Sequence, residues 1–129
     1  MLTEMIAEVE QANAGFYRAF ASLDIKHMDA VWAHEDGVTC IHPGWSLRAG
    51  WPAVRDSWVT IFNHTFSMHF RLSEIIIQVA GNVAWVLCME NIMNSPEGAG
   101  QESRVLATNL FERQQGQWRM IHHHGSHVM

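Results

Sequence analysis

The first candidate for chemistry is a histidine at the end of an apolar run. His42 follows residues 38–41 and directly precedes Pro43. A histidine can act as a general base near neutral pH without a large shift of its pKa. Asn109 could polarise a carbonyl by donating a hydrogen bond, and Tyr17, the only tyrosine, could do the same. These catalytic candidates suit proton abstraction next to a carbonyl, or addition and elimination of water. The alternative is that His42 and Asn109 are hydrogen-bonded structural groups.

A run of three histidines near the end of the chain invites a metal-site interpretation. Successive side chains on a strand point to opposite faces, so His122 and His124 share one face and His123 lies on the other. Simple alternation adds Trp118 and Met120 to the face of His122. Three adjacent histidines therefore cannot bind one ion, and no carboxylate spacing completes a site. We expect neither a metal nor another cofactor.

Glu90 is a carboxylate within the apolar stretch 87–92. If it faces inward, burial raises its pKa, or the carboxylate needs a partner such as Arg104 or one of the terminal histidines. An outward-facing Glu90 is the open alternative. An inward Glu90 would join the candidate ligand-binding residues, together with His123.

Aromatic side chains are the candidate walls of a pocket. The chain has six tryptophans and six phenylalanines in 129 residues. Aromatic walls with a few polar groups fit a small, largely apolar organic ligand, and ordinary core packing is the alternative. The candidates for these walls are Trp45, Trp51, Trp58, Phe62 and Trp85.

Composition excludes several classes of function. A length of 129 residues with 48% hydrophobic and 16% charged residues fits one folded domain spanning residues 1–129. The net charge of −5 argues against nucleic acid as a partner, because phosphate binding needs a basic stripe. No apolar run approaches the length of a membrane span. Only two cysteines occur, each in an apolar run, which suits buried thiols and a cytoplasmic location.

Hydrophobic periodicity predicts helices first and strands afterwards. Helices are expected over residues 3–22, with Thr3 as the cap, then over 25–33 with Asp24 as the cap, and over 51–63. A short strand is expected over 38–42, with turns at 43–44 and 48–50. Four longer strands follow, with a loop at 94–100, over residues 66–78, 83–93, 101–113 and 117–128. This order indicates an α+β fold, a curved antiparallel sheet shaped like a cone and wrapped by three N-terminal helices.

Motifs in one order along nearly the whole chain carry a family resemblance. They are His42-Pro43-Gly44-Trp45, Ser57-Trp58 with Ile61-Phe62, Ala84-Trp85-Val86 with Glu90, Ala107-Thr108-Asn109 with Phe111, and Trp118 with His122-His123-His124 and Ser126. The combination resembles the SnoaL-like branch of the nuclear transport factor 2-like superfamily. That superfamily hosts isomerases, cyclases, dehydratases and binding modules, so it implies a fold more than an activity.

Two relatives imply particular site residues. The layout is similar to ketosteroid isomerase, whose base position falls on His42, whose later acid falls on Asn109, and whose tyrosine falls near Phe16 or Tyr17. The last strand resembles that of the calcium/calmodulin-dependent protein kinase association domain. That resemblance places the Gly125 position in the pocket.

Alternation from Gly125 then carries His123 into the pocket and leaves His122 and His124 near a dimer interface. The resemblance implies a homodimer through the sheet and a small organic ligand, with no nucleic acid or membrane partner. The expected function is ligand binding, with acid–base chemistry of the isomerase, cyclase or dehydratase kind. The alternative is a non-catalytic ligand-sensing or oligomerising association module.

Overall fold

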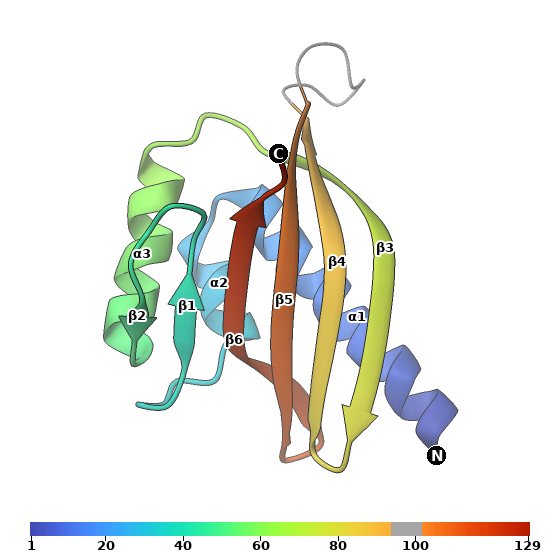
Figure 1. Ribbon diagram of the computed structural model, residues 1–129. Coiled ribbons are helices and arrows are strands. Elements are labelled where there is room, and N and C mark those ends of the chain that lie inside the picture. Colours follow the sequence, from blue (N-terminus) through green and yellow to red (C-terminus); the bar gives the residue numbers. More distant parts are fainter. Residues whose placement is uncertain (94–101) are drawn as a thin grey trace.

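The computed structural model describes residues 1–93 and 102–129, so the loop expected at 94–100 lies outside the described residues (Figure 1). These described residues form three helices and six strands. The helices are α1 (Leu2–Ser22), α2 (Ile25–Val31) and α3 (Trp51–Asn63). The strands are β1 (Thr39–Ile41), β2 (Arg48–Ala49), β3 (His69–Ala80), β4 (Val83–Met93), β5 (Glu102–Gln114) and β6 (Gln117–His127).

All six strands form one curved, open sheet in the order β2-β1-β6-β5-β4-β3. Strands β3 to β6 make the expected antiparallel meander, with α1 and α2 behind it in Figure 1. The α+β cone is therefore confirmed, with one refinement. Strand β1 runs parallel to β6, with Thr39 opposite His122, so the sheet is mixed. Residues 48–49, expected to lie in a turn, pair with β1 instead.

Local signals explain most of the helix ends. Leu23 ends α1 in a left-handed conformation with φ 56°, and its N–H donates to the carbonyl of Phe20. The carboxylate of Asp24 accepts from the N–H of Lys26 and so caps α2. The expected Thr3 cap is wrong, because α1 begins at Leu2 without a capping side chain. Helix α3 spans the expected residues 51–63, with a proline in its first turn.

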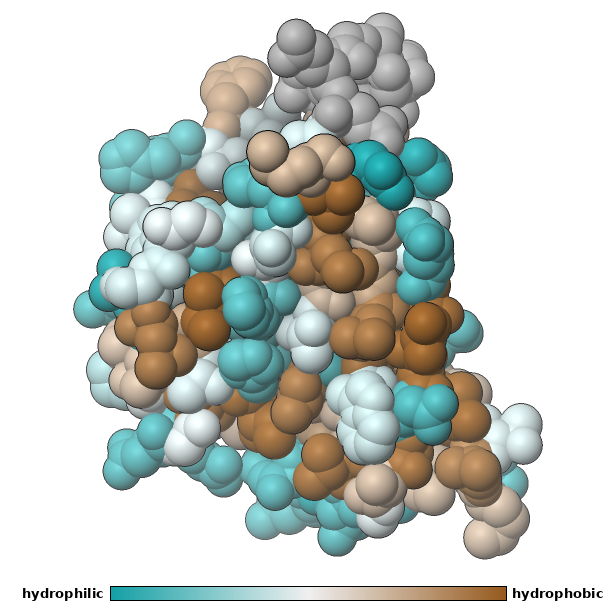
Figure 2. Space-filling view, viewed as in Figure 1, coloured by the Kyte–Doolittle hydropathy of each residue, from teal (hydrophilic) through white to brown (hydrophobic). Residues whose placement is uncertain are grey.

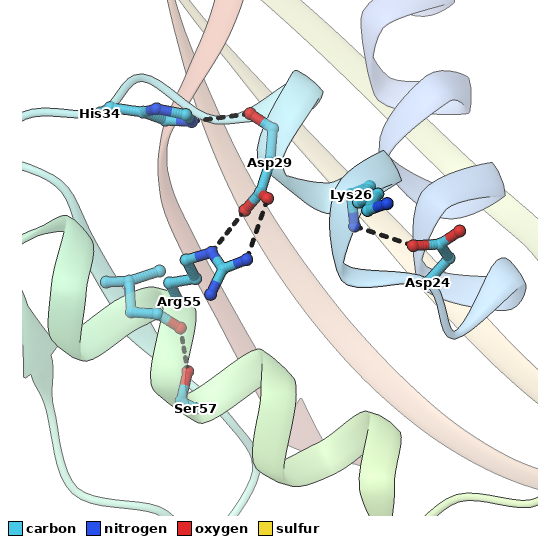
Figure 3. A network of polar contacts seen from close by, with 7 residues as sticks. Asp24, Lys26, Asp29, His34, Arg55 and Ser57 are labelled. Carbon is cyan, nitrogen blue, oxygen red and sulfur yellow. Dashed lines mark hydrogen bonds and ion pairs between the residues drawn. The ribbon is translucent and has the colours of Figure 1, made fainter.

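An ion pair ties α3 to α2. The Nε and Nη2 atoms of Arg55 donate to the two carboxylate oxygens of Asp29 at 2.8 and 3.1 Å (Figure 3). The same view shows the imidazole of His34 against the carbonyl of Asp29, at 2.7 Å. A bidentate pair between a guanidinium and a carboxylate fixes the relative orientation of the two side chains as well as their distance. The contact therefore helps to orient α3, which carries Ser57 and Trp58 into the interior.

A cluster of aromatic rings joins the helices to the sheet. Phe16 and Phe20 of α1 lie 5.7 and 4.7 Å from the ring of Trp58, measured between ring centroids and in edge-to-face orientation. Phe20 also meets Phe70 of β3 at 4.7 Å. Edge-to-face contacts of this kind favour one arrangement of the rings beyond the burial of apolar area. The cluster fixes α1 against the inner face of the sheet.

Strand β6 changes face at a bulge. Met120 lies opposite Phe111, and His122 lies opposite Leu110, so Ile121 is the extra residue between them. Simple alternation placed Met120 on the face of His122, and that expectation is wrong. Met120 and His123 are both buried against the inner side, at 0% and 1% exposed. His123 still lies on the face opposite His122 and His124, because no bulge separates those three residues.

The outer face of the sheet carries exposed apolar side chains. Ile76 of β3, Trp85 of β4 and Leu106 of β5 are 52%, 38% and 48% exposed. Figure 2 shows apolar residues gathered over β3 to β5 on this side. Trp85, expected as a pocket wall, therefore faces outward, because its neighbours Ala84 and Val86 fill the inner face. Among the described residues, no helix has the length and apolarity to cross a bilayer.

Candidate functional site

Four polar side chains from four elements meet inside the cone. Tyr17 lies on the buried face of α1, and Glu90 lies on the inner face of β4. Asn109 of β5 pairs in register with His123 of β6. All four residues are 5% exposed or less. Buried polar groups need hydrogen-bond partners, so the contacts among them define the arrangement.

Each hydrogen-bond donor follows the last in one order, from His123 to Asn109, then to Tyr17, and finally to Glu90. The Nδ2 atom of Asn109 donates to the hydroxyl of Tyr17 at 3.2 Å and to Oδ1 of Asn13 at 2.9 Å. Its Oδ1 atom can only accept, so Nδ1 of His123 is the donor across 2.6 Å. The Tyr17 hydroxyl in turn donates to Oε2 of Glu90 at 2.5 Å. We call His123, Asn109, Tyr17 and Glu90 the interior chain.

Burial sets the charge states of the interior chain. It raises the pKa of Glu90 from its ordinary value of 4.5 to about 7, although the hydrogen bond from Tyr17 works in the opposite direction. Burial, and then the neighbouring Glu90 charge, raises the pKa of Tyr17 well above its usual range. Burial and nearby histidines lower the pKa of His123 well below its usual range. Glu90 is therefore the member that changes protonation near neutral pH.

Arg104, one of the partners considered for Glu90, is not its partner. Arg104 lies on the outer side, with Nη2 3.7 Å from a carboxylate oxygen of Glu74. Both side chains of that pair are largely exposed. The partner of Glu90 is Tyr17, which comes from 73 positions away in the chain.

His42 belongs to a second buried pair. Its Nε2 atom lies 2.8 Å from Oγ of Ser57. Ser57 donates its proton to the carbonyl of Val54 at 2.6 Å, so His42 donates to the serine oxygen and its Nδ1 carries the lone pair. Burial, assisted by the charge of Arg48, lowers the pKa of His42 to about 4. The imidazole is therefore neutral at physiological pH.

The structure thus brings two of the three catalytic candidates together. Tyr17 and Asn109 are hydrogen-bonded in the interior chain. The ring of His42 lies 6.3 Å from that of His123, and both rings contact Trp58, at 4.6 and 5.7 Å between centroids. The indole of Trp58 therefore packs against both polar groups.

The aromatic candidates differ in their surroundings. Trp58 is fully buried and Phe62 is 8% exposed, so both pack in the core. The buried Nε1 atom of Trp58 has no hydrogen-bond partner among the described residues. Trp45 is half-buried, and its ring meets the edge of His42 at 5.0 Å between centroids.

Two hollows in the surface reach these polar groups. One, of about 290 Å³, has Tyr17 and Phe70 in its lining, between α1 and β3. The other, of about 220 Å³, has Trp45, Arg48 and Ser57 in its lining, between β2 and α3. Each hollow therefore has a buried residue with a hydroxyl group in its lining. In the described part of the chain, no three His, Cys, Asp or Glu side chains are grouped to hold a metal ion.

Sequence reasoning missed Asn13, Arg48 and Ser57. Asn13 is 2% exposed and accepts from Asn109. Its spacing of four residues before Tyr17 was an available signal, because such residues share a helix face. Arg48 and Ser57 become functional candidates only through folding, which brings β2 and α3 beside His42.

Comparisons with known proteins identify the family of the chain. A family model described as a SnoaL-like domain matches residues 9–129. The F-box protein SKIP8 of Arabidopsis thaliana is 31% identical over 114 residues, which cover 88% of this chain. Those residues cover 47% of SKIP8, so the chain spans about half the length of that curated relative.

Two solved structures share the whole fold. A candidate dehydratase of the nuclear transport factor 2-like family from Streptomyces avermitilis is 30% identical, with a TM-score of 0.89, and the match covers 100% of this chain and 99% of that one. A candidate calcium/calmodulin-dependent protein kinase type II association domain from Thiobacillus denitrificans is 28% identical, with a TM-score of 0.86, covering 93% and 94%. The sheet, the helices and the family match together show that the chain belongs to the SnoaL-like family of the nuclear transport factor 2-like superfamily.

Proposed function

We propose that this protein binds a small, largely apolar organic molecule and moves a proton on it by general acid–base chemistry. The observation that carries the proposal is the interior chain, in which a buried carboxyl with a pKa of about 7 contacts a positioned tyrosine. A group whose pKa lies near the working pH can both accept and donate a proton. The similarity to a candidate dehydratase supports elimination of water as the reaction type.

Each member of the interior chain has a proposed role. Tyr17 lines the hollow between α1 and β3, so it is the member of the interior chain that a ligand there meets first. Asn109 donates to the tyrosine oxygen and so directs the hydroxyl proton away from itself. Glu90 gives or takes the proton, and His123 holds the amide of Asn109 in place. These roles follow from which group donates and which accepts in each hydrogen bond.

The reaction can be tested without the natural substrate. A β-hydroxy ketone such as diacetone alcohol carries both an acidic C–H and a hydroxyl that leaves as water. The protein should accelerate exchange of that C–H proton in heavy water, followed by NMR, above the rate in buffer. Glu90→Gln should reduce the acceleration by at least tenfold, because the amide cannot take the proton. Tyr17→Phe should also reduce it.

A matched control removes a carboxylate elsewhere. Glu74→Gln changes an exposed residue on β3, paired with Arg104 on the outer side. Its exchange rate should equal that of the unmodified protein. Exchange at the buffer rate in the unmodified protein, or an unchanged rate in Glu90→Gln, would contradict the proposed chemistry.

The outer face of the sheet favours a second role as an oligomerising module. Ile76, Trp85 and Leu106 leave an apolar surface in contact with water. The similarity to a candidate association domain supports assembly through this face. We propose a homodimer in which the outer faces of two sheets meet. This role is compatible with chemistry in the interior, because the two surfaces are on opposite sides of the sheet.

A further inference from the structure

A hollow beside β2 is lined by a positively charged side chain that lies over an aromatic ring. Its volume is about 220 Å³, and it lies where β2 approaches α3. The guanidinium carbon of Arg48 is 5.1 Å from the centroid of the Trp45 ring. None of the described carboxylates lies within ion-pair distance of Arg48. The hollow is lined by Trp45, Arg48, Ala53, Asp56, Ser57 and Thr60.

Ser57 lines the hollow and is also a member of the second buried pair, with His42. Ser57 is 3% exposed and accepts a hydrogen bond from His42. The ring of Trp45 touches the edge of the same imidazole. Arg48 is close enough for its charge to affect the protonation of His42. The cation, the ring and the buried pair therefore belong to one local site.

The charged side chains in the lining, Arg48 and Asp56, favour one class of ligand. A guanidinium presents a planar fork that matches a carboxylate, and it also stacks on aromatic faces. The guanidinium lies over the half-buried ring of Trp45, so the cation and the ring together form one wall of the hollow. Asp56 is exposed on the same lining, and its negative charge disfavours a second anionic group on the ligand.

We propose that this hollow binds the carboxylate end of a small, flat organic acid with one negative charge, held by Arg48 against the ring of Trp45. The inference goes beyond the proposed function, because this hollow lies beside His42 and Ser57, whereas the proposed proton transfer takes place at Tyr17 and Glu90. Arg48 is a residue that determines specificity, and it takes no part in proton transfer.

The probes are benzoate, its uncharged analogue benzamide, and the dianion phthalate. Binding is followed by calorimetry and by the NMR signal of the Trp45 indole N–H, assigned with Trp45→Phe. Benzoate should bind at least about tenfold more tightly than benzamide, since a hydrogen bond to a charged group contributes on that scale. Phthalate should bind more weakly than benzoate because of Asp56.

Variants separate the charge from the fold. Arg48→Gln should weaken benzoate binding about tenfold and leave benzamide unchanged, whereas Arg48→Lys should give an intermediate loss because it keeps the charge without the fork. Arg113→Gln is the matched control, since Arg113 is exposed on β5 and lines neither this hollow nor the one beside Tyr17. Its affinity for benzoate should equal that of the unmodified protein.

Two results would overturn the inference: equal affinity for benzoate and benzamide, or unchanged benzoate affinity in Arg48→Gln. Thermal unfolding of each variant shows whether a loss of binding is a loss of fold. The binding measurement needs no turnover, so its outcome is separate from the proton-exchange test. Exchange without selective benzoate binding removes this inference alone, and selective binding without exchange removes the acid–base proposal alone.

Discussion

At the scale of single residues, Glu90 gives the protein a distinctive dependence on pH. Its pKa in the folded state is raised from 4.5 to about 7, so the folded protein holds a proton that the unfolded chain has already lost in that window. The associated stability is fully present below about pH 4.5 and is lost as the pH rises through about 7. The size of this effect is about 3 kcal/mol.

Glu90→Gln should remove that dependence. Denaturant unfolding from about pH 4.5 to about pH 8 should show the unmodified protein losing about 3 kcal/mol relative to the variant. The variant must be compared with the unmodified protein because His42 also contributes to the pH dependence. Its lowered pKa makes the folded protein more stable as the pH rises from about 4 to about 6.5, which is opposite to the effect of Glu90. Parallel stability curves for the two proteins would contradict a raised pKa of Glu90 in the folded state.

Asn109 should be highly sensitive to substitution. Its side chain satisfies Asn13, Tyr17 and His123 at once. Asn109→Leu would leave these buried groups without their partner and should lower the free energy of unfolding by about 3 kcal/mol. Asn63→Leu, at an exposed position of α3, is the matched control and should change it little. An equal effect of the two changes in denaturant unfolding would contradict the interior chain.

At the scale of elements, Gly125 lies where β6 passes close to Val105 of β5 and to Pro43, just after β1. A Cβ atom at this position would lie 3.0 Å from Cγ1 of Val105 and 3.3 Å from Cδ of Pro43. Gly125→Ala should therefore destabilise the protein by about 2 kcal/mol through overpacking. Gly37→Ala, where nothing lies within 4 Å, should have a much smaller effect on the melting temperature. A tolerated Gly125→Ala would show that β1 is less tightly held than the contacts indicate.

Local sequence patterns predicted the bounds of the elements better than they predicted how the strands pair. The bounds of α3 and β4 follow from hydrophobic period and from Gly and Pro, which act within a few residues. The parallel pairing of β1 with β6 joins residues about 83 apart, and no local pattern signals it. The bulge at Ile121 is likewise a consequence of fitting β5 to β6. It is the reason that Met120 lies on the inner face.

At the scale of the whole molecule, the two faces of β6 separate two proposed roles. His123 lies in the interior chain, whereas His122 and His124 lie on the outer side, with ring centroids 6.3 Å apart. If two copies pair through the outer face, Trp85→Asp with Leu106→Asp should give monomers in light scattering, because the charges would be buried without partners. His124→Glu should weaken dimerisation and leave benzoate affinity unchanged. An unmodified protein that is monomeric, or a dimer unaffected by the double change, would remove the proposed interface.

For the molecule as a whole, the sequence by itself determined the fold class, and it indicated only some of the polar residues that meet in the interior. Alternation and helical period are local properties, and the order of motifs already resembled this family. Only the tertiary structure decided which polar groups are partners: Glu90 with Tyr17, and His42 with Ser57. Buried donors and acceptors must be satisfied by whatever folding brings within reach, and those partners are separated by 73 and 15 positions. The physical reason is that sequence spacing sets a residue's face, whereas packing between elements sets its neighbour.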